Sequence, residues 1–155
     1  MMTLKTRGVT FIELLLALAV LGVLLILCTS SISNLFTQQQ IKGQTQRLFH
    51  TLQYARAEAI KQNRQIMVCP TLDFIRCADD WSKGYMVFNS EKILLVQQNM
   101  HPIPIKTSVT RIIYRGDGRA FNRGTFQLGM GTQQYRIVIY DSGRSRIEAP
   151  AIERA

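Results

Sequence analysis

The chain has 155 residues and a formal net charge of +9 at neutral pH. This length fits one small domain with an additional segment, and the basic excess favours anionic partners such as nucleic acid, lipid headgroups or acidic proteins. The two histidines and three cysteines lack the spacing of metal ligands, and no motif of a catalytic or cofactor site is present. We therefore predict a binding or structural protein without catalytic residues, cofactor or metal.

The N-terminal region combines a short basic leader with a long apolar run. Lys5 and Arg7 precede Gly8, and Glu13 is the only charged residue between Val9 and Cys28. As a helix, residues 9–28 would span roughly 30 Å, the hydrocarbon thickness of a bilayer. The basic leader would keep the N-terminus in the cytoplasm. This pattern predicts a single transmembrane helix in contact with lipid, followed by a domain on the periplasmic side.

These residues resemble the class III signal of type IV prepilins and type II secretion pseudopilins. The resemblance implies a leader of residues 1–8, cleavage after Gly8 by prepilin peptidase, methylation of the new N-terminus at Val9, and a role for Glu13 in docking the subunit into a filament. Most members carry phenylalanine at the position of Val9. The alternative is an ordinary signal anchor, but here the good cleavage motif precedes the apolar run, so the run would stay on the product.

The helical period continues beyond the apolar run. Apolar residues recur at a spacing of three to four, at Ile32, Leu35, Phe36, Ile41, Leu48, Leu52, Ala55, Ala59 and Ile60. Polar and charged residues lie between them, as on an amphipathic helix. We therefore predict a periplasmic amphipathic helix over residues 29–63.

After Arg64 the pattern changes to short runs typical of strands. The predicted strands cover residues 65–69, 85–88, 93–96, 111–114, 124–128 and 135–140. Glycine, proline, asparagine and aspartate separate them, as turns require. Short strands after one long helix predict an α+β fold, in which an antiparallel sheet packs on the helix and residues 64–155 form the β-rich head.

Several motifs in this part resemble the GspH/FimT family of minor pilins and pseudopilins. They lie at residues 52–60, 68–70, 80–88, 114–119 and 124–126. The resemblance implies a type IV pilin-like fold and an inner-membrane protein that crosses the bilayer once. It also implies assembly into a pilus or pseudopilus, with other major and minor pilins and the inner-membrane assembly platform as partners.

Two cysteines lie in the predicted head. Cys69 and Cys77 would face a compartment that permits oxidation, so we predict a disulfide between them. Next to them, Asp79 and Asp80 are predicted to lie in a solvated loop, because neighbouring side chains point apart and cannot act as an acid/base pair. Trp81 is predicted to pack under that loop, with a stacking platform as the alternative.

Arginine dominates the C-terminal third of the chain. From Ile103 onward, eight arginines accompany a single lysine. The planar guanidinium donates to two phosphate oxygens at once and stacks on bases, whereas a surface designed for solubility would mix lysine and glutamate. The excess therefore favours recognition of an anion.

The sharpest motif is Gly143-Arg144-Ser145-Arg146, which follows a predicted turn. If residues 144–147 are extended, Arg144 and Arg146 project to the same side, ~6.6 Å apart, and could grip one phosphate backbone. The pattern resembles the C-terminal motif by which FimT minor pilins of naturally transformable bacteria bind DNA. Alternatively, these arginines only pair with acids such as Asp141 or Glu148. The supporting candidates for DNA contact are Lys106, Arg111, Arg115 and Arg119.

Together these features predict a minor type IV pilin that binds extracellular double-stranded DNA through its phosphates for uptake in natural transformation, with the head near the pilus tip. The alternative is a GspH-type pseudopilin or pilus-priming subunit that acts in filament assembly alone. The two differ in whether the arginines contact DNA.

Overall fold

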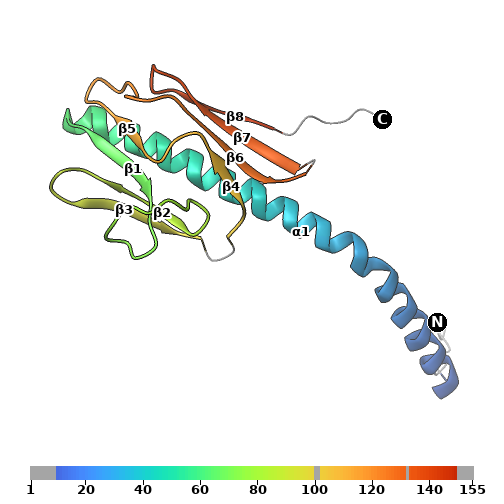
Figure 1. Ribbon diagram of the computed structural model, residues 1–155. Helices are drawn as coiled ribbons and strands as arrows, with labels where there is room; N and C mark the ends of the chain where they lie inside the picture. Colours follow the sequence, from blue (N-terminus) through green and yellow to red (C-terminus); the bar gives the residue numbers. More distant parts are fainter. Residues whose placement is uncertain (1–9, 100–101, 132, 150–155) are drawn as a thin grey trace, which may run out of the picture. The chain divides into compact units, whose positions relative to one another are not determined.

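A computed structural model describes residues 10–99, 102–131 and 133–149, with the backbone alone for residues 25–34 (Figure 1). The predicted leader, including Gly8 and Val9, lies outside the described residues. Helix α1 covers Phe11–Gln62 and ends where the sequence predicts. The strands that follow are β1 (Ile66–Pro70), β2 (Gly84–Phe88), β3 (Ile93–Gln98), β4 (Ile105–Thr107), β5 (Ile112–Tyr114), β6 (Gly124–Met130), β7 (Gln133–Ile139) and β8 (Ser145–Glu148).

The chain divides into two compact units, Met1–Thr37 and Gln38–Ala155. In the first unit, the described residues are the N-terminal part of α1. The carbonyl of Thr10 accepts hydrogen bonds from the amides of Glu13 and Leu14, which starts the helix. A search of the described residues finds no helix that is both long and apolar enough to cross a membrane. The predicted transmembrane segment begins at Val9, outside the described residues, and stays a prediction.

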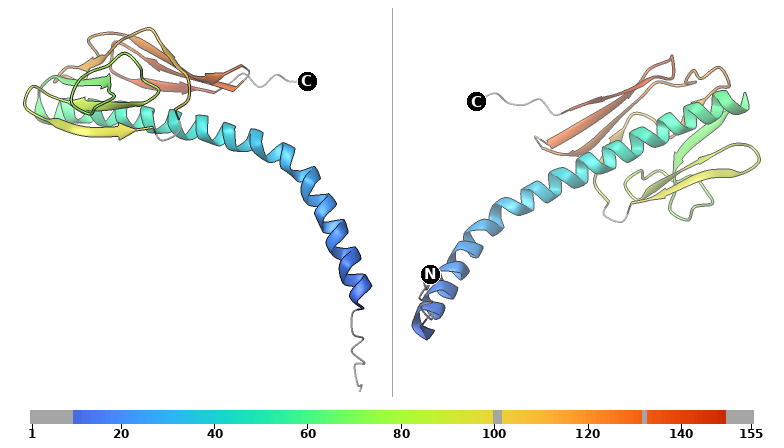
Figure 2. Two further views of the ribbon diagram at one scale, coloured as in Figure 1. Left: turned by 60° about the horizontal axis from the view of Figure 1, so that its bottom comes forward. Right: turned by 180° about the vertical axis from the view of Figure 1, so that it is seen from behind.

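In the second unit, eight strands form two antiparallel sheets of four strands each, in the orders β3-β2-β1-β5 and β4-β6-β7-β8. The C-terminal part of α1 runs along the junction of the two sheets, as Figure 2 shows most clearly in its right view. The predicted α+β, pilin-like fold is confirmed. The prediction of one sheet is refined to two, because β4 pairs with β6 rather than with a strand of the first sheet.

One apolar core joins α1 to both sheets. On the helix, Ile41, Leu48, Leu52, Ala55 and Ala59 are buried, as the three-to-four spacing predicts. From the sheets, the core takes fully buried side chains of β1, β2, β5, β6 and β7. The helix and both sheets therefore share one hydrophobic core, and burial of this surface is the main favourable term in folding.

Three positions of the predicted helix face are not buried. Leu35, Phe36 and Ile60 are each at least half exposed. Leu35 and Phe36 belong to the first unit, whose described residues offer no second element against which they could pack. Ile60 covers Gly118 from the surface, since a Cβ at Gly118 would lie 2.6 Å from its Cδ1. These three residues therefore lie on the predicted helix without being buried in the core, and the side chain of Ile32 is outside the described part.

Trp81 is a core residue rather than a stacking platform. Its side chain is buried, and its ring forms a T-shaped pair with the ring of Phe126 at a centroid distance of 4.7 Å. Asp80 lies at the surface, where its carboxylate accepts a hydrogen bond from the amide of Ser82 at 2.8 Å. Hydrogen bonds from Ser82 hold the pKa of Asp80 below its usual value, as expected for an ionised turn residue.

Cys69 and Cys77 form a disulfide, with Cα atoms 5.6 Å apart. Cys69 is buried in β1, whereas the loop that it closes carries the exposed side chains of Leu72 and Ile75. We expect replacement of both cysteines by serine to lower the free energy of unfolding by roughly 2–3 kcal/mol, because the open loop gains conformational entropy in the unfolded chain. Urea denaturation with and without reductant would measure this. An equal midpoint for the reduced and oxidised protein would contradict the expectation.

Two buried tyrosines predict loss of stability at high pH. Burial raises the pKa of Tyr85 to about 12 and also raises that of Tyr114. In the unfolded chain, tyrosine ionises near pH ~10. The contribution of the two buried, protonated tyrosines to the free energy of unfolding is therefore fully present below pH ~10. As the pH then rises towards the folded-state values, each tyrosine should reduce the free energy of unfolding by about 1.4 kcal/mol per pH unit. Denaturation curves from pH 8 to 11 would measure the decline, and a free energy of unfolding that stays constant over this range would contradict it.

Candidate nucleic-acid interface

The Gly143-Arg144-Ser145-Arg146 motif forms the end of a β-hairpin. Strands β7 and β8 pair in antiparallel register, with Val138 opposite Arg146. The turn over residues 140–144 is closed by the amide of Tyr140, which donates to the carbonyl of Arg144 at 2.9 Å, and by the amide of Gly143, which donates to the carbonyl of Tyr140 at 2.8 Å. Strand β8 begins at Ser145, so Arg144 lies at the entrance to the strand and Arg146 within it.

Gly143 shapes this turn and is not available to a ligand. Its φ is +74°, a left-handed conformation that favours glycine, and the residue is buried. A Cβ at this position would lie 1.9 Å from the carbonyl oxygen of Gly118. The burial of Gly143 favours a structural role in the turn over the predicted contact with DNA. The glycine is required because the hairpin turn packs directly against another piece of backbone.

That second piece of backbone is the turn over residues 115–119, which follows β5. The amide of Gly118 donates to the carbonyl of Arg115 at 2.8 Å, and the amide of Arg115 donates to the carbonyl of Arg119 at 2.9 Å. Asp117 caps the turn by accepting a hydrogen bond from the amide of Arg119 at 3.0 Å. We call residues 115–119 and 140–144 the paired turns, since the amide of Ala120 also donates to the carbonyl of Asp141 at 3.2 Å.

The two arginines of the motif are exposed but differ in their partners. The guanidinium of Arg146 donates to Glu148 Oε1 at 2.6 Å, and Arg136 lies 3.8 Å from the other oxygen of the same carboxylate. This hydrogen bond from Arg146 raises the pKa of its guanidinium above the usual value. By contrast, the side chain of Arg144 has no hydrogen bond or ion pair with any described residue. The predicted alternative of pairing with acids thus holds for Arg146, while Asp141 pairs with Arg123 at 3.3 Å.

Lys106 lies on the same outward face of the sheet as these arginines. In register across the four strands, Lys106 is opposite Gln127, Gln127 is opposite Arg136, and Arg136 is opposite Glu148. Residues directly opposite share a face of a sheet, and Arg146 shares it with Glu148 because it is two residues away. We call the side formed by Lys106, Arg136 and Arg146 the basic face.

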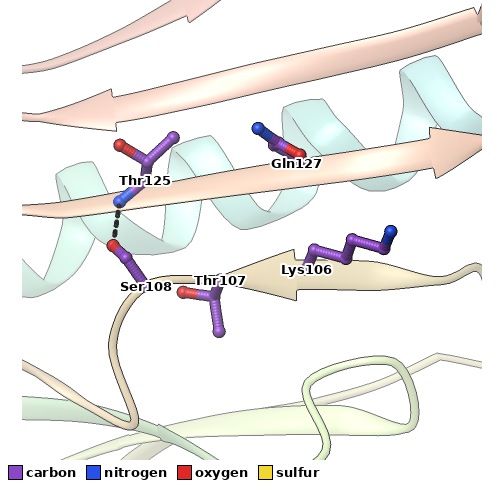
Figure 3. A pocket seen from close by; sticks show the side chains of 5 residues that line it. All are labelled: Lys106, Thr107, Ser108, Thr125 and Gln127. Carbon is purple, nitrogen blue, oxygen red and sulfur yellow. Dashed lines mark hydrogen bonds between the residues drawn. The ribbon is translucent and has the colours of Figure 1, made fainter.

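A shallow depression at the edge of the sheet lies beside Lys106 (Figure 3). Its volume is about 220 Å³, and its lining consists of Lys106, Thr107, Ser108, Thr125 and Gln127. The hydroxyl of Ser108 accepts a hydrogen bond from the amide of Thr125 at 3.1 Å, which joins the end of β4 to β6. The lining offers one ammonium group together with hydroxyl and amide groups, and its side chains carry no acid.

The remaining predicted candidates lie elsewhere. Arg115 and Arg119 are exposed on the paired turns, near the motif in space although distant in sequence. Arg111 lies at the opposite end of β5, where its carbonyl accepts a hydrogen bond from the side chain of Asn122 at 2.7 Å. Arg136 was not among the predicted site residues. The signal that could have found it is its alternation with Tyr135 and Ile137, because one side of β7 had to face water.

Glu13 lies on α1, in the first unit. Its side chain borders a shallow groove together with Leu16, Ala17, Val20, Leu21 and Leu24. Among the described residues, no group of three or more histidine, cysteine or acidic side chains is arranged to hold a metal ion. The described polar groups therefore offer two features of interest, the basic face in the second unit and a single carboxylate on an apolar helix in the first.

Comparison with known families identifies the class of protein. The profile described as "Type II transport protein GspH" matches residues 44–143, which is well over half of the chain. The chain belongs to the GspH family. A profile described as "Prokaryotic N-terminal methylation motif" matches residues 3–29, which include the predicted cleavage position Gly8. No curated protein sequence matches the chain.

Solved structures share the fold of this GspH-family chain. The minor type IV pilin FimU of Pseudomonas aeruginosa has 23% sequence identity and a TM-score of 0.59, over 75% of this chain and 94% of that one. The minor pseudopilin EpsH of the type II secretion system of Vibrio cholerae has 15% identity and a TM-score of 0.53, over 72% and 98% of the respective chains. The predicted resemblance to minor pilins and pseudopilins is thus confirmed.

Membership of the GspH family makes the chain a pilin-like subunit that associates with other pilins in an inner-membrane-anchored pilus or pseudopilus, rather than a member of a known enzyme family. The match to the GspH profile ends at Gly143. It therefore includes the glycine that shapes the turn but not Arg144 or Arg146, whose function has to be argued from their own chemistry.

Proposed function

We propose that this minor pilin binds the phosphates of double-stranded DNA through Arg144 and the basic face, and that it serves DNA uptake in natural transformation. The observation that carries the proposal is the exposed guanidinium of Arg144, which has no partner among the described residues and follows a turn held by a buried glycine. A fixed backbone reduces the entropy that a side chain loses on binding. Arg146, two residues further along the same hairpin, adds a second guanidinium group.

The geometry suits a phosphate backbone rather than a base edge. Residues two apart on a strand are separated by ~6.6 Å and project to the same side, so Arg144 and Arg146 can contact neighbouring phosphates of one strand. Arg136 and Lys106 extend the same face across the sheet towards β4. Contacts of this kind give affinity and orientation without reading the sequence. We expect DNA to be bound with little sequence preference.

The second candidate function is assembly alone, in a type II secretion pseudopilus or as a pilus-priming subunit. The ion pairs of Glu148 with Arg136 and Arg146 favour it, because they show that part of the arginine excess is matched within the head. Under this hypothesis, the basic face contacts a neighbouring subunit or solvent. Under the same hypothesis, Arg144 would pair with an acidic group of a neighbouring subunit.

The remaining predictions concern how the subunit is processed, anchored and assembled. We infer that prepilin peptidase cleaves after Gly8 and that the amine of Val9 is methylated. Residues 9–28 then anchor the subunit in the bilayer, and Glu13 docks it against a neighbouring pilin, with the head near the tip. An isolated carboxylate on an apolar helix needs such a partner. Normal filament incorporation of Glu13→Ala would reject this role of the glutamate.

The test of DNA binding is a titration of labelled duplex DNA with the full-length chain in a non-ionic detergent. With two or more phosphate contacts, affinity should fall about tenfold or more between ~50 and ~200 mM salt. Duplexes of unrelated sequence should bind equally. Absence of saturable binding at low salt, or an affinity independent of salt, would reject the proposal.

A further inference from the structure

Arg56 is a half-buried arginine of α1 that the proposed interface does not use. Its Nε–H donates to the carbonyl oxygen of Gly118 at 2.9 Å, and its Nη2 reaches the carbonyl oxygen of Ser142 at 3.4 Å. Gly118 belongs to one of the paired turns and Ser142 to the other. A single guanidinium from the helix therefore bonds to both turns, although they come from different sheets.

The contacts of Arg56 complete an assembly that is already close-packed. The amide of Ala120 donates to the carbonyl of Asp141 across the paired turns, and the space between Gly143 and Gly118 is too small for a Cβ. On the helix, the neighbouring residue Ala55 is buried in the core. Arg56 thus connects the two turns to a helix that is packed in the core of the head.

The exposed arginines of the paired turns depend on this connection for their positions. Arg115 and Arg119 project from the first turn, and Arg144 projects from the second. A turn that moved independently would spread its guanidinium over many positions, and fixing it on DNA would cost conformational entropy. Groups that bind with precision are held by neighbouring hydrogen bonds for this reason.

We infer that Arg56 is a positioning residue for phosphate binding, which holds Arg144 in register with Arg119 and Arg115 by bonding to both turns. This inference rests on the proposed function. It assigns Arg56 no contact with DNA. A lysine could not substitute for it, because the planar guanidinium reaches two carbonyls with separate N–H groups, whereas the ammonium of lysine is a compact point charge.

The experiment measures duplex affinity of the full-length chain in non-ionic detergent for Arg56→Gln and Arg56→Lys. Both variants should bind about two- to tenfold more weakly, the range expected when one side chain has to be immobilised on binding. The matched control is Arg47→Gln, which removes the same charge from an exposed position of the same helix and should change affinity less. If Arg56→Lys binds like the wild-type chain, charge alone is sufficient and the inference is wrong.

A second set of variants separates positioning from general destabilisation. In a chain that already carries Arg144→Gln and Arg146→Gln, Arg56→Gln should have a smaller effect on affinity, because Arg144 is gone and only Arg115 and Arg119 are left to position. In ¹⁵N NMR spectra, the amide signals of Gly118 and Gly143 should shift or broaden in Arg56→Gln while signals from β1 and β2 stay in place. An equal loss of affinity in both backgrounds would overturn the inference. If replacing Arg144 and Arg146 does not change the affinity, the proposed DNA-binding site is rejected, whatever the result for Arg56.

Discussion

Replacing Arg144 and Arg146 together by glutamine should weaken duplex binding about a hundredfold at low salt, because each charge-assisted contact contributes ~1.5 kcal/mol or more. The loss should be similar for all duplex sequences, since phosphates carry no sequence information. The plot of log affinity against log salt should flatten by at least about one unit. Both side chains are exposed, so the thermal unfolding midpoint should stay close to that of the wild-type chain.

The matched control for this pair is Arg47→Gln with Arg76→Gln, two exposed arginines outside the basic face. This control loses the same charge but should keep most of the affinity. In cells, the Arg144 and Arg146 variant should transform poorly while pili still assemble. The reverse result, lost filaments or secretion with DNA binding retained, would favour the assembly hypothesis. Unchanged affinity and salt dependence in a folded variant would show that the site is wrong.

Gly143→Ala should be among the most damaging single substitutions in the turns of the head. The alanine would have to keep the left-handed backbone conformation of Gly143, and its Cβ would overlap the carbonyl oxygen of Gly118. The conformational cost and the steric overlap together should lower the free energy of unfolding by roughly 2–4 kcal/mol. Because relief requires the paired turns to separate, DNA binding should also weaken, although Arg144 and Arg146 are both intact.

Gly131→Ala is the control for this substitution. Gly131 also has a positive φ, +62°, but nothing lies within 4 Å of a Cβ at that position. It should cost about 1 kcal/mol, the conformational term alone. Urea denaturation of both variants would separate the two contributions. If Gly143→Ala costs no more than Gly131→Ala, the paired turns are not packed as tightly as the geometry indicates.

The sequence predicts those elements of the fold that leave a local pattern. Helix α1 ends at Gln62, as the apolar spacing indicates, and the six predicted strands all occur within a few residues of their expected bounds. Two strands are not among these six. The three residues of β4, between Pro104 and Ser108, are too short to show an alternation, and β8 was expected only conditionally, as an extended segment over residues 144–147. The separation into two sheets was missed for a different reason, since strand order depends on pairing between distant segments and local patterns do not carry it.

In the candidate site too, the sequence predicts some features and not others. A turn before Arg144 could be predicted from Asp141, Ser142 and Gly143, because these residue types favour turns. That Gly143 faces Gly118 could not be predicted, since the contact joins segments of different sheets. In the sequence, Arg56 is one of many polar residues on the solvent face of a helix. Only the fold shows that its guanidinium bonds to the carbonyls of Gly118 and Ser142.

The carboxylate of Glu148 has a consequence for how the DNA contacts would respond to salt. The salt response arises because arginines that neutralise phosphates release the cations condensed on DNA, whereas the charge of Arg146 is already matched by a carboxylate of its own chain. A phosphate that displaces Glu148 exchanges one fixed charge for another, so much of the salt response would come from Arg144 instead. Arg144→Gln alone should therefore change the salt dependence more than Arg146→Gln alone, and Glu148→Gln should bring the two closer together.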